Sequence, residues 1–425
     1  MMSSIDRSFL VSLFNAAVAA ADPKEALRGH LPDRPKGRTV VIGAGKGSSQ
    51  LAAAFEDLWG EPVEGVVVTR YGYATPCRYL RVLEAAHPIP DKAGLNASKA
   101  LLEAVSNLNE DDLVIALISG GGSSLLPALP NGLTLNDEQL LNSILLKSGA
   151  PIKVMNAIRK HVSQIKGGRL AAAAFPARVV TLVVSDVPGD DPSAVASGPT
   201  VPSEVSLEDT RSLITNYCIK LPKSIISHLE NEAARAPIAD DVIFSRNDTR
   251  VIASACLSLE AAQYESERQG IPAVILSDAI EGESRDVGLV HAALIHEIVA
   301  KNRPFVAPIV LLSGGETTVK MLNTGGRGGR NSEFLLSLAT AIDGLDNVNA
   351  LAADTDGIDG SEDNAGAFVD GKSVTRMRLS GLDPMRSLLT HNSWEAFEQV
   401  GDLFVTGPTG TNVNDFRAIL IRPHK

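Results

Sequence analysis

The sequence predicts an α/β protein that contains a parallel sheet and more than one domain. Its 425 residues are too many for a single core and suggest two or three domains. Apolar and β-branched runs at 113–118 and 179–184 indicate strands that are buried on both faces, as in parallel sheets. Both runs lead directly into loops rich in glycine or proline, which is typical of ligand sites at the carboxyl edge of such a sheet.

Composition limits the classes of function. The chain carries a formal net charge of −11, and 44% of its residues are hydrophobic. We expect so acidic a chain to bind neither nucleic acid nor an anionic membrane, so an anionic substrate needs a local basic cluster. The three cysteines, Cys77, Cys218 and Cys256, are widely separated and form no CxxC pair. They predict no zinc site and fit the reducing cytoplasm.

The N-terminal apolar stretch, residues 9–20, could be a signal peptide or a packing helix. Only Arg7 precedes it and Asn15 interrupts it, which is unlike a signal peptide. We therefore expect an amphipathic packing helix, because one helical face collects Phe9, Leu10, Leu13, Phe14 and Ala17. Nowhere do about 18 apolar residues run together, so we expect no transmembrane helix.

The stretch 179–200 joins a buried strand to a loop that carries three acids. Asp186, Asp190 and Asp191 follow the strand among prolines and glycines, which hold a loop in one shape and let its backbone approach a ligand. Each residue alone is equally typical of an ordinary turn. Together with the sequence Ser-Gly-Pro-Thr at 197–200 they indicate a candidate ligand site.

A strand, a glycine turn and a helix are predicted at 38–59. Gly43 and Gly45 match the start of a dinucleotide-binding fingerprint, but Ser48 replaces its third glycine, and the following strand ends at Arg70 rather than at an acid. Lys46 stands at the helix N-terminus, where a cation opposes the helix dipole. A bound anion at that helix end would compensate for it, whereas a solvated lysine is the alternative.

The stretch 113–126 reads as a buried strand, three glycines, two serines and an apolar helix start. Glycines without Cβ atoms expose backbone N–H groups, and the serines add hydroxyl donors, which predicts a phosphate cradle rather than a flexible turn. Residues 309–319 repeat the pattern and suggest a second glycine loop. The nucleotide-binding candidates are Gly120, Gly121, Gly122, Ser123, Ser124, Gly314 and Gly315.

Basic side chains occur in two further segments. A helix is predicted from residue 152, with an apolar stripe facing the core and with Gly167 and Gly168 as its C-terminal stop. Arg159 and Lys166 share another face of it, where they could hold an anionic substrate or be solvated. The stretch 325–333 combines Arg327 and Arg330 with four glycines, so both could approach a carboxylate or phosphate bidentately.

A third acidic segment, 351–360, sets Asp354, Asp356 and Asp359 at a predicted strand end. Its spacing does not match an EF-hand, and a magnesium role for one of these carboxylates stays open. Composition changes near Pro237, which predicts domains at 1–237 and 238–425.

These segments together resemble the class II glycerate 2-kinases of the MOFRL type, once labelled hydroxypyruvate reductases. The resemblance covers nearly the whole chain. Its motifs are GAGK at 43–46, HPIPD at 87–91, SGGGSSLL at 119–126, NAIRKHVSQIKGGRLA at 156–171, SDVPGDDPSAVASGPT at 185–200, SGGETTV at 313–319, GGRN at 328–331, DTDGIDG at 354–360 and TGPTGTNVND at 406–415. The chain departs from the family pattern at residues 47–49 and at Ser332, and neither departure removes a charged group.

The resemblance implies a reaction, a fold and an active site. The implied reaction transfers phosphate from ATP to D-glycerate, giving 2-phosphoglycerate and ADP, with Mg²⁺ or another divalent cation. The implied fold is a larger Rossmann-like N-terminal domain and a smaller C-terminal α/β domain, with the active site in the cleft between them. By position, Lys46 and Arg330 match family residues that face this cleft. Monomer and homodimer both stay open.

A mechanism that fits these residues assigns each of them a role. The loop 120–124 would cradle the ATP phosphates, and Lys46 with Arg330 would neutralise the transferring group and the glycerate carboxylate. Asp186 would accept the proton of the 2-hydroxyl. The remaining candidates are Arg159, Lys166 and Arg327 for substrate and Asp190 and Asp356 for metal. How Asp186, Asp190 and Asp356 divide the base and metal roles stays open.

Two other functions compete with this interpretation. An NAD(P)H-dependent hydroxypyruvate reductase needs a complete dinucleotide fingerprint, which the stretch 43–48 lacks. A non-catalytic sensor of sugar acids or nucleotides is the second alternative. Three acids in one loop favour an enzyme over a sensor, because like-charged acids in one site usually imply a metal.

Overall fold

The computed structural model describes residues 2–321 and 326–423. The chain divides into two compact units. One unit is Pro23–Ile252, and the other combines Met1–Asp22 with Ala253–Lys425. We call them the first-sheet unit and the second-sheet unit.

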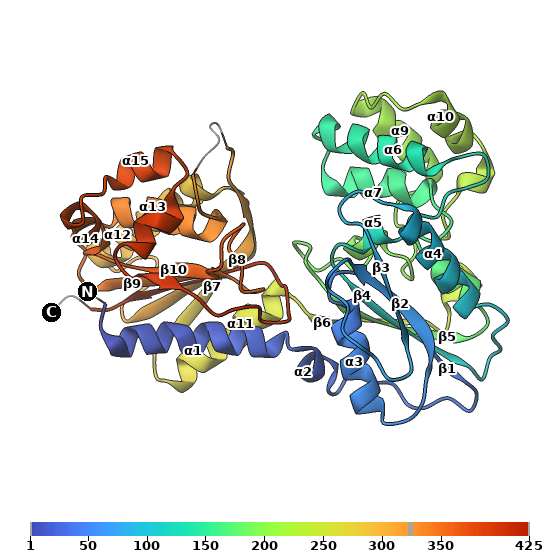
Figure 1. Cartoon of the computed structure of the whole chain (residues 1–425), viewed down its shortest axis with the longest axis horizontal. Coiled ribbons are helices and arrows are strands. Elements are labelled where there is room, and N and C mark those ends of the chain that lie inside the picture. Colours follow the sequence, from blue (N-terminus) through green and yellow to red (C-terminus); the bar gives the residue numbers. More distant parts are fainter. Residues whose placement is uncertain (1, 322–325, 424–425) are drawn as a thin grey trace. The chain divides into compact units, whose positions relative to one another are not determined.

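The first-sheet unit is built on a six-stranded sheet with the strand order β3-β2-β1-β4-β5-β6 (Figure 1). The pairs β1–β2, β1–β4, β2–β3 and β4–β5 are all parallel. Every residue of β4 is buried, because helices cover both faces of the sheet. The strands are β1 Thr39–Ala44, β2 Glu64–Arg70, β3 Arg81–Ala85, β4 Leu113–Ser119, β5 Arg178–Val184 and β6 Asp248–Ala253.

Helices of this unit contribute to more than one apolar core. α3 and α4 pack on the sheet, whereas α6, α7, α9 and α10 share a separate core that includes Leu141, Ile158 and Ile225. The α-helices are α2 Pro23–Leu27, α3 Ser48–Trp59, α4 Lys92–Ala104, α5 Gly122–Leu125, α6 Leu135–Ser148, α7 Ile152–His161, α8 Arg169–Ala174, α9 Leu207–Asn216 and α10 Lys223–Leu229. Three short 3₁₀ helices are η1 Val195–Ser197, η2 Glu232–Ala234 and η3 Val242–Phe244.

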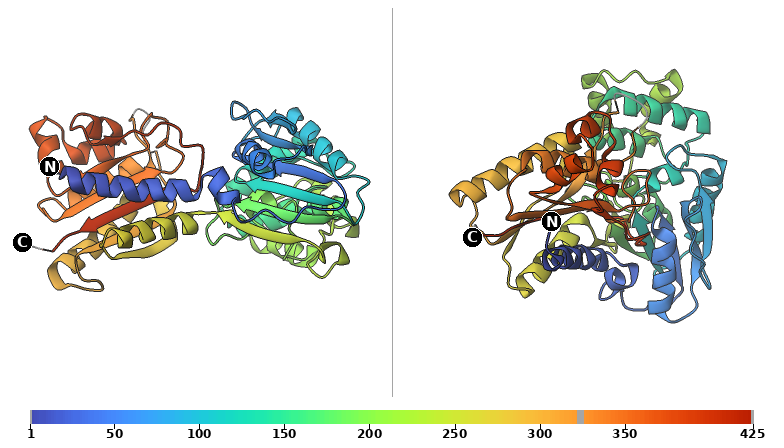
Figure 2. Two further views of the ribbon diagram at one scale, coloured as in Figure 1. Left: turned by 90° about the horizontal axis from the view of Figure 1, so that it is seen from below. Right: turned by 60° about the vertical axis from the view of Figure 1, so that its left-hand side comes forward.

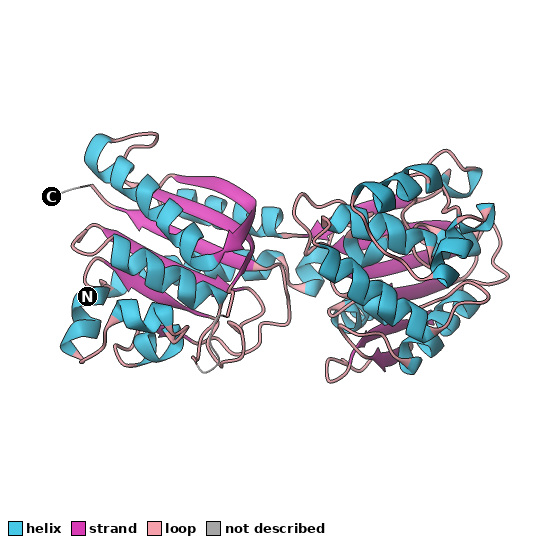
Figure 3. Cartoon of the chain, turned by 90° about the horizontal axis from the view of Figure 1, so that it is seen from above, coloured by secondary structure: helices cyan, strands magenta, loops and turns pink. Residues whose placement is uncertain are grey.

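The second-sheet unit contains a mixed six-stranded sheet with the order β11-β10-β9-β12-β8-β7. Its β7–β8 pair is parallel, and the pairs β8–β12, β12–β9, β9–β10 and β10–β11 are antiparallel. Figure 3 shows the strands of each unit as one layer with helices against it. The strands are β7 Ala273–Glu283, β8 Ile309–Thr318, β9 Val348–Asp354, β10 Gly366–Asp370, β11 Leu403–Phe404 and β12 Asp415–Ile421.

Alternate residues of this sheet face two helical layers. Leu311 and Ala350 pack with α12 and α13, whereas Val310 and Leu351 pack with α1 and α11. Figure 2 shows α1 and α11 side by side along the sheet. The helices are α1 Ser4–Ala20, α11 Ala255–Arg268, α12 Ser284–Lys301, α13 Arg330–Ala341, α14 Ser373–Leu379, α15 Pro384–Leu389 and α16 Ser393–Glu398.

The N-terminal amphipathic helix is confirmed. The five residues predicted for its apolar face are the buried residues of α1, and Phe14 meets Phe404 and Phe416 edge to face. Among the described residues, no helix has both the length and the apolar character that a membrane span requires.

The predicted α/β fold with a parallel first sheet is confirmed, but the compact units differ from the predicted domains 1–237 and 238–425. α1 packs on the second sheet because its aromatic face matches Phe404 and Phe416. β6 lies beside β5 and completes the first sheet, although it follows residue 237. Residues 242–244, which follow the predicted boundary, form the 3₁₀ helix η3.

Candidate functional site

Five strand ends of the first-sheet unit and the segments that follow them lie along the carboxyl edge of its sheet. Because β1 to β5 run parallel, the residues that follow each strand lie along the same edge. In sheet order they are His87 after β3, Arg70 at the end of β2, Lys46 after β1, the loop 120–124 after β4, and Asp186 after β5.

The glycine loop 120–124 is tightly fitted. The carbonyl oxygen of Gly120 accepts a hydrogen bond from the Lys46 N–H at 2.9 Å. Gly121 has φ +80°, a conformation that favours glycine. A Cβ on Gly122 would lie 2.6 Å from the Cβ of Ala196. The loop therefore needs its glycines, and it ends in the short helix α5, whose first N–H groups have no partner inside the helix.

Lys46 lies across this loop. A Cβ on Gly121 would be 3.0 Å from Lys46 Cγ and 3.1 Å from Lys46 Cε. No other described residue forms a hydrogen bond or ion pair with its ammonium group. An uncompensated cation next to exposed backbone N–H groups makes an environment that attracts anions.

The His87 side chain lies over the same glycine, Gly121. Its Nε2 would be 3.1 Å from a Cβ on Gly121. Burial, with smaller contributions from the positive charges of Lys46 and Arg70, lowers the pKa of His87 to about 4. The imidazole is therefore neutral at physiological pH, so it can donate a hydrogen bond from one ring nitrogen and accept one at the other.

The acidic loop, residues 185–200, begins in contact with the glycine loop. A Cβ on Gly120 would lie only 1.8 Å from Asp186 Oδ2, so the Asp186 carboxylate rests directly on the Gly120 backbone. Asp191 is turned away, because its carboxylate accepts hydrogen bonds from the backbone N–H of Ser193 at 2.9 Å and from its hydroxyl at 3.1 Å. Asp190 has φ +53° and a half-buried side chain.

The acidic loop and the glycine loop are also joined by hydroxyl groups. The Ser123 and Ser197 hydroxyls lie 2.7 Å apart, and the Ser197 hydroxyl donates to Asn156 Oδ1 at 3.2 Å. Ser124 donates to the carbonyl oxygen of Gly121 at 3.3 Å. Both predicted serines therefore hold the loop in shape.

The helix predicted from residue 152 to a stop at Gly167 and Gly168 is too long. α7 ends at His161, and Gly167 and Gly168 adopt positive φ of +62° and +81°. Their N–H groups donate to the carbonyls of Ser197 and Gly198. The segment leaves the helical path because it pairs with the Ser-Gly-Pro-Thr turn of the acidic loop.

This break separates Arg159 from Lys166. Arg159 is held by Asn142 at 2.9 Å and Asn156 at 3.2 Å. The Lys166 ammonium binds Glu138 Oε1 at 2.6 Å, and both side chains are almost fully buried. Lys166 is thus committed to a buried ion pair, and we assign it a structural role.

The second-sheet unit gathers its acids around Arg330, the first residue of α13. The Arg330 guanidinium binds Asp415 at 2.6 Å, Asp354 at 2.5 Å and Glu316 at 3.0 Å. Burial alone would lower the pKa of Arg330, but the three carboxylates outweigh it and raise the pKa. Burial raises the pKa of Asp354 to about 8 against the effect of Arg330, with a smaller contribution from Asp356.

Two further predicted residues of this unit, Asp359 and Arg327, contact other parts of the fold. Asp359 is fully buried and accepts the backbone N–H groups of Asn331 and Ser332, which caps α13. Arg327 binds Glu362 and stacks on Trp394, with its Cζ 3.6 Å from the ring centre. Gly325, the first residue of the predicted arginine loop, lies outside the described residues.

The predicted second glycine loop is wrong. Gly314 and Gly315 lie inside strand β8 and pair with β12. A Cβ on Gly315 would lie 2.2 Å from the carbonyl oxygen of Ile280 on β7. The glycines allow close strand packing here and form no cradle.

The donors available for a divalent cation are carboxylates. Within 2–321 and 326–423, no three His, Cys, Asp or Glu side chains are grouped to hold a metal ion. Mg²⁺ in phosphate-transferring sites usually takes only one or two protein carboxylates and completes its shell with water and phosphate oxygens. The half-exposed Asp190 on the acidic loop fits that requirement. Asp356 accepts the N–H of Ile358 at 2.8 Å, which uses one of its oxygens.

Sequence reasoning missed three residues of this arrangement. Arg70 ends β2 and His87 lies two residues after β3, and a position at a strand end could have identified both. Asp415, which anchors Arg330, begins β12 and also accepts from Thr317 and Asn331. No local pattern marks it, because its partners come from β8 and α13.

The fold and the edge residues define a class of protein before any comparison. A parallel α/β sheet with a glycine loop, an unpaired lysine and an acidic loop at its carboxyl edge is typical of enzymes that bind phosphate-bearing ligands. Comparisons with known proteins identify the family. The MOFRL family matches residues 309–415, and a Domain of unknown function (DUF4147) matches residues 9–230.

Relatives match almost the full chain. The Glycerate 2-kinase of Pyrococcus horikoshii is 41% identical over 403 residues, which are 94% of this chain and 90% of that protein. A protein of Agrobacterium vitis that carries the provisional name hydroxypyruvate reductase is 51% identical over 417 residues, 98% of this chain and 94% of that one. The crystal structure of glycerate kinase from Thermotoga maritima matches with a TM-score of 0.90 at 36% identity and covers 99% of this chain and 100% of that one.

The chain therefore belongs to the MOFRL-type glycerate kinase family, and it is an enzyme of the kinase class.

Proposed function

We propose that this enzyme transfers the γ-phosphoryl group of ATP to the 2-hydroxyl of D-glycerate and releases 2-phosphoglycerate and ADP. The observation that carries the proposal is the Lys46 side chain, which lies across Gly121 of the glycine loop without an acidic partner among the described residues. The kinase names of the relatives in Pyrococcus horikoshii and Thermotoga maritima supply the substrate.

The glycine loop and Lys46 bind the nucleotide phosphates in this proposal. Phosphoryl transfer requires positioning and neutralisation of charge on the moving group, and little covalent chemistry by the protein. Backbone N–H groups of the loop donate to phosphate oxygens, and the Lys46 ammonium neutralises the transferring phosphoryl group.

Asp186 acts as the general base. Its carboxylate rests on the backbone of Gly120, the first residue of the loop that holds the phosphates. From there it accepts the proton of the attacking 2-hydroxyl. The proton transfer leaves no free alkoxide and contributes a rate factor of about 10² to 10⁴.

Asp190 would hold Mg²⁺, whose chemistry when bound is to neutralise negative charge on the phosphates. Asp190 has the chemistry for this role, as an oxygen ligand on the same loop as the base. Asp356 is a weaker candidate because the N–H of Ile358 already binds one of its oxygens.

Arg330 binds the carboxylate of the acceptor. Asp354 and Asp415 fix the guanidinium in place through buried contacts. Its third contact, Glu316, is about half exposed, and exposed ion pairs contribute only about 0 to 1 kcal/mol. A substrate carboxylate therefore displaces Glu316 at small cost and takes its place on Arg330.

The provisional name of the Agrobacterium vitis relative raises an NAD(P)H-dependent reductase as the second candidate. The edge residues favour the kinase. A dinucleotide site needs a third glycine where the buried Ser48 begins α3, and an acid where Arg70 ends β2.

A coupled assay separates the two functions. Purified protein is incubated with D-glycerate, ATP and Mg²⁺, and ³¹P NMR distinguishes 2-phosphoglycerate from 3-phosphoglycerate, while hydroxypyruvate with NADH is tested in parallel. The proposal predicts the 2-isomer without oxidation of NADH. Oxidation of NADH without a phosphorylated product would establish the reductase. If the protein acts neither on D-glycerate with ATP nor on hydroxypyruvate with NADH, a non-catalytic sensor is the remaining function.

The Asp186→Asn variant tests the base. It keeps the shape of the side chain and removes its proton affinity, so turnover should fall by roughly 10² or more while ATP binding is kept. Turnover close to that of the unmodified enzyme would refute the assignment.

A further inference from the structure

Charge is distributed unevenly along the carboxyl edge of the first sheet. In the strand order β3-β2-β1-β4-β5, the residues that follow β3, β2 and β1 are His87, Arg70 and Lys46. The glycine loop follows β4, and the acidic loop follows β5. The edge therefore has a basic half and an acidic half, with the glycine loop between them.

The basic half has no acidic partner among the described residues. Arg70 stacks on Tyr73, with its Cζ 4.1 Å from the ring centre, and forms no ion pair there. Neither the Lys46 ammonium group nor the His87 ring forms a hydrogen bond or ion pair with another described residue. The three side chains are half-buried, and their gathering without an acidic partner at a ligand edge indicates that the partner is a ligand.

The acids nearest in sequence are already occupied. Asp91 accepts hydrogen bonds from the Tyr71 hydroxyl at 2.8 Å and from the Gly94 N–H at 2.9 Å. Glu84 accepts the Gly72 N–H at 2.7 Å. Both carboxylates hold the loops after β2 and β3 and leave the charge of Arg70 uncompensated.

We propose that Arg70 and His87 join Lys46 to form a clamp that binds an oxyanion of the substrates above Gly121. The inference rests on the proposed function and adds two residues to it. Lys46 and His87 lie at the same point over Gly121, and Arg70 ends the strand between theirs in the sheet. Burial, Lys46 and Arg70 lower the pKa of His87, so the ring enters the clamp as a neutral donor.

The three groups complement each other in chemistry. The guanidinium of Arg70 presents a planar fork that suits two oxygens at once, and the Lys46 ammonium acts as a point charge. The neutral imidazole of His87 donates one hydrogen bond. A phosphate of ATP and the carboxylate of D-glycerate both fit this description.

Isothermal titration calorimetry with two separate probes tests the clamp. The Mg²⁺ complex of a non-hydrolysable ATP analogue and D-glycerate are each titrated into the unmodified enzyme, Arg70→Gln, His87→Leu and the conservative His87→Gln. Loss of a hydrogen bond to a charged group weakens binding by roughly 10-fold or more. We expect that loss in Arg70→Gln and His87→Leu and a smaller loss in His87→Gln.

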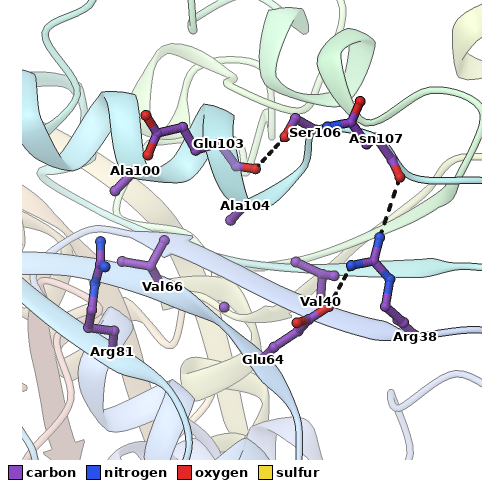
Figure 4. Close-up of a pocket in the computed structure, with 11 residues that line it drawn as sticks. Arg38, Val40, Glu64, Val66, Arg81, Ala100, Glu103, Ala104, Ser106 and Asn107 are labelled. Atoms are coloured by element: carbon purple, nitrogen blue, oxygen red, sulfur yellow. Dashed lines mark hydrogen bonds and ion pairs between the residues drawn. The ribbon is translucent and has the colours of Figure 1, made fainter.

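Arg81→Gln is the matched control. Arg81 begins β3 at the opposite end of the strand, is exposed, and forms no ion pair among the described residues. Figure 4 shows it on the wall of a hollow of about 480 Å³, with Val66 and Glu103 nearby. The control changes the net charge equally but lies away from the clamp, so binding of both probes should stay within about 2-fold.

Each outcome has a defined meaning. Weaker binding of the ATP analogue alone supports the clamp and identifies phosphate as its ligand, whereas weaker binding of D-glycerate alone supports it and identifies the carboxylate. Unchanged binding of both probes in Arg70→Gln and His87→Leu overturns the clamp. If the unmodified enzyme binds neither probe, the proposed function fails first, and the two failures are thus distinguished.

Discussion

The Gly120→Ala variant tests whether the position of Asp186 controls turnover. Gly120 has no positive φ, so its backbone accepts alanine without strain. The new Cβ would lie 1.8 Å from Asp186 Oδ2, 2.2 Å from Cγ and 2.7 Å from Oδ1. Real Cβ contacts are not shorter than 3.0 Å, so the carboxylate must move by more than an ångström.

The size of the effect follows from that movement. A displacement of about 1 Å in a catalytic group lowers the rate by about 10². Overpacking of this kind costs about 1 to 3 kcal/mol, which lowers the melting temperature by several degrees for a unit of this size. We therefore expect a folded enzyme whose kcat is about 100-fold lower.

Gly47→Ala is the control for an added methyl group in the neighbouring loop. Its Cβ would meet Ser119 Oγ at 3.6 Å, an ordinary contact, so kcat should stay within about 2-fold. Steady-state kinetics and differential scanning calorimetry are measured on both variants. If kcat of Gly120→Ala equals that of the unmodified enzyme, Asp186 is not the base. A change in KM for ATP alone would assign the effect to the glycine loop.

Three further predictions concern the ion pair, the histidine and the metal. Lys166→Met leaves Glu138 buried without its partner, so the free energy of unfolding in urea should fall by about 3 to 5 kcal/mol. The double variant that combines Lys166→Met with Glu138→Met should recover most of the lost stability. A loss of D-glycerate affinity without a loss of stability would contradict the structural role of Lys166. The His87 ring should titrate by NMR with a pKa of about 4. Because folding lowers this pKa from 6.5, the stability that neutral His87 contributes is present above pH 6.5 and is lost as the pH falls toward 4. A titration midpoint of the His87 ring near pH 6.5 would contradict its burial. Asp190→Asn should raise the Mg²⁺ concentration for half-maximal activity by roughly 10-fold at unchanged saturating kcat, and an unchanged requirement would exclude Asp190 as a ligand.

Local patterns predicted the edge of the first sheet well. Buried strands were expected at 113–118 and 179–184, and β4 and β5 occupy them. The helix predicted at 48–59 is α3 to the residue, because a glycine turn fixes its start and Gly60 in the left-handed region fixes its end. That these loops share one edge of the sheet follows from parallel pairing, which such runs indicate.

Tertiary pairing overrode the local pattern where the predictions failed. The apolar stripe favoured one helix up to a stop at Gly167 and Gly168, but α7 already ends at His161, and both glycines donate hydrogen bonds to the acidic loop. Gly314 and Gly315 resemble the first glycine loop in sequence, yet β7 continues alongside them and extends the strand. The surroundings of Arg330 come from β8, β9 and β12, and a linear sequence does not reveal which strands become neighbours.

The central claim is that the carboxyl edge of the first sheet carries out the phosphoryl transfer. A crystal structure of the enzyme with ADP, aluminium fluoride, Mg²⁺ and D-glycerate tests it most directly, because the fluoride mimics the moving phosphoryl group. We expect the fluoride over Gly121 with the Lys46 ammonium within hydrogen-bond distance, and the glycerate 2-hydroxyl facing Asp186. A nucleotide bound elsewhere, with Lys46 in solvent, would refute phosphoryl transfer at this edge.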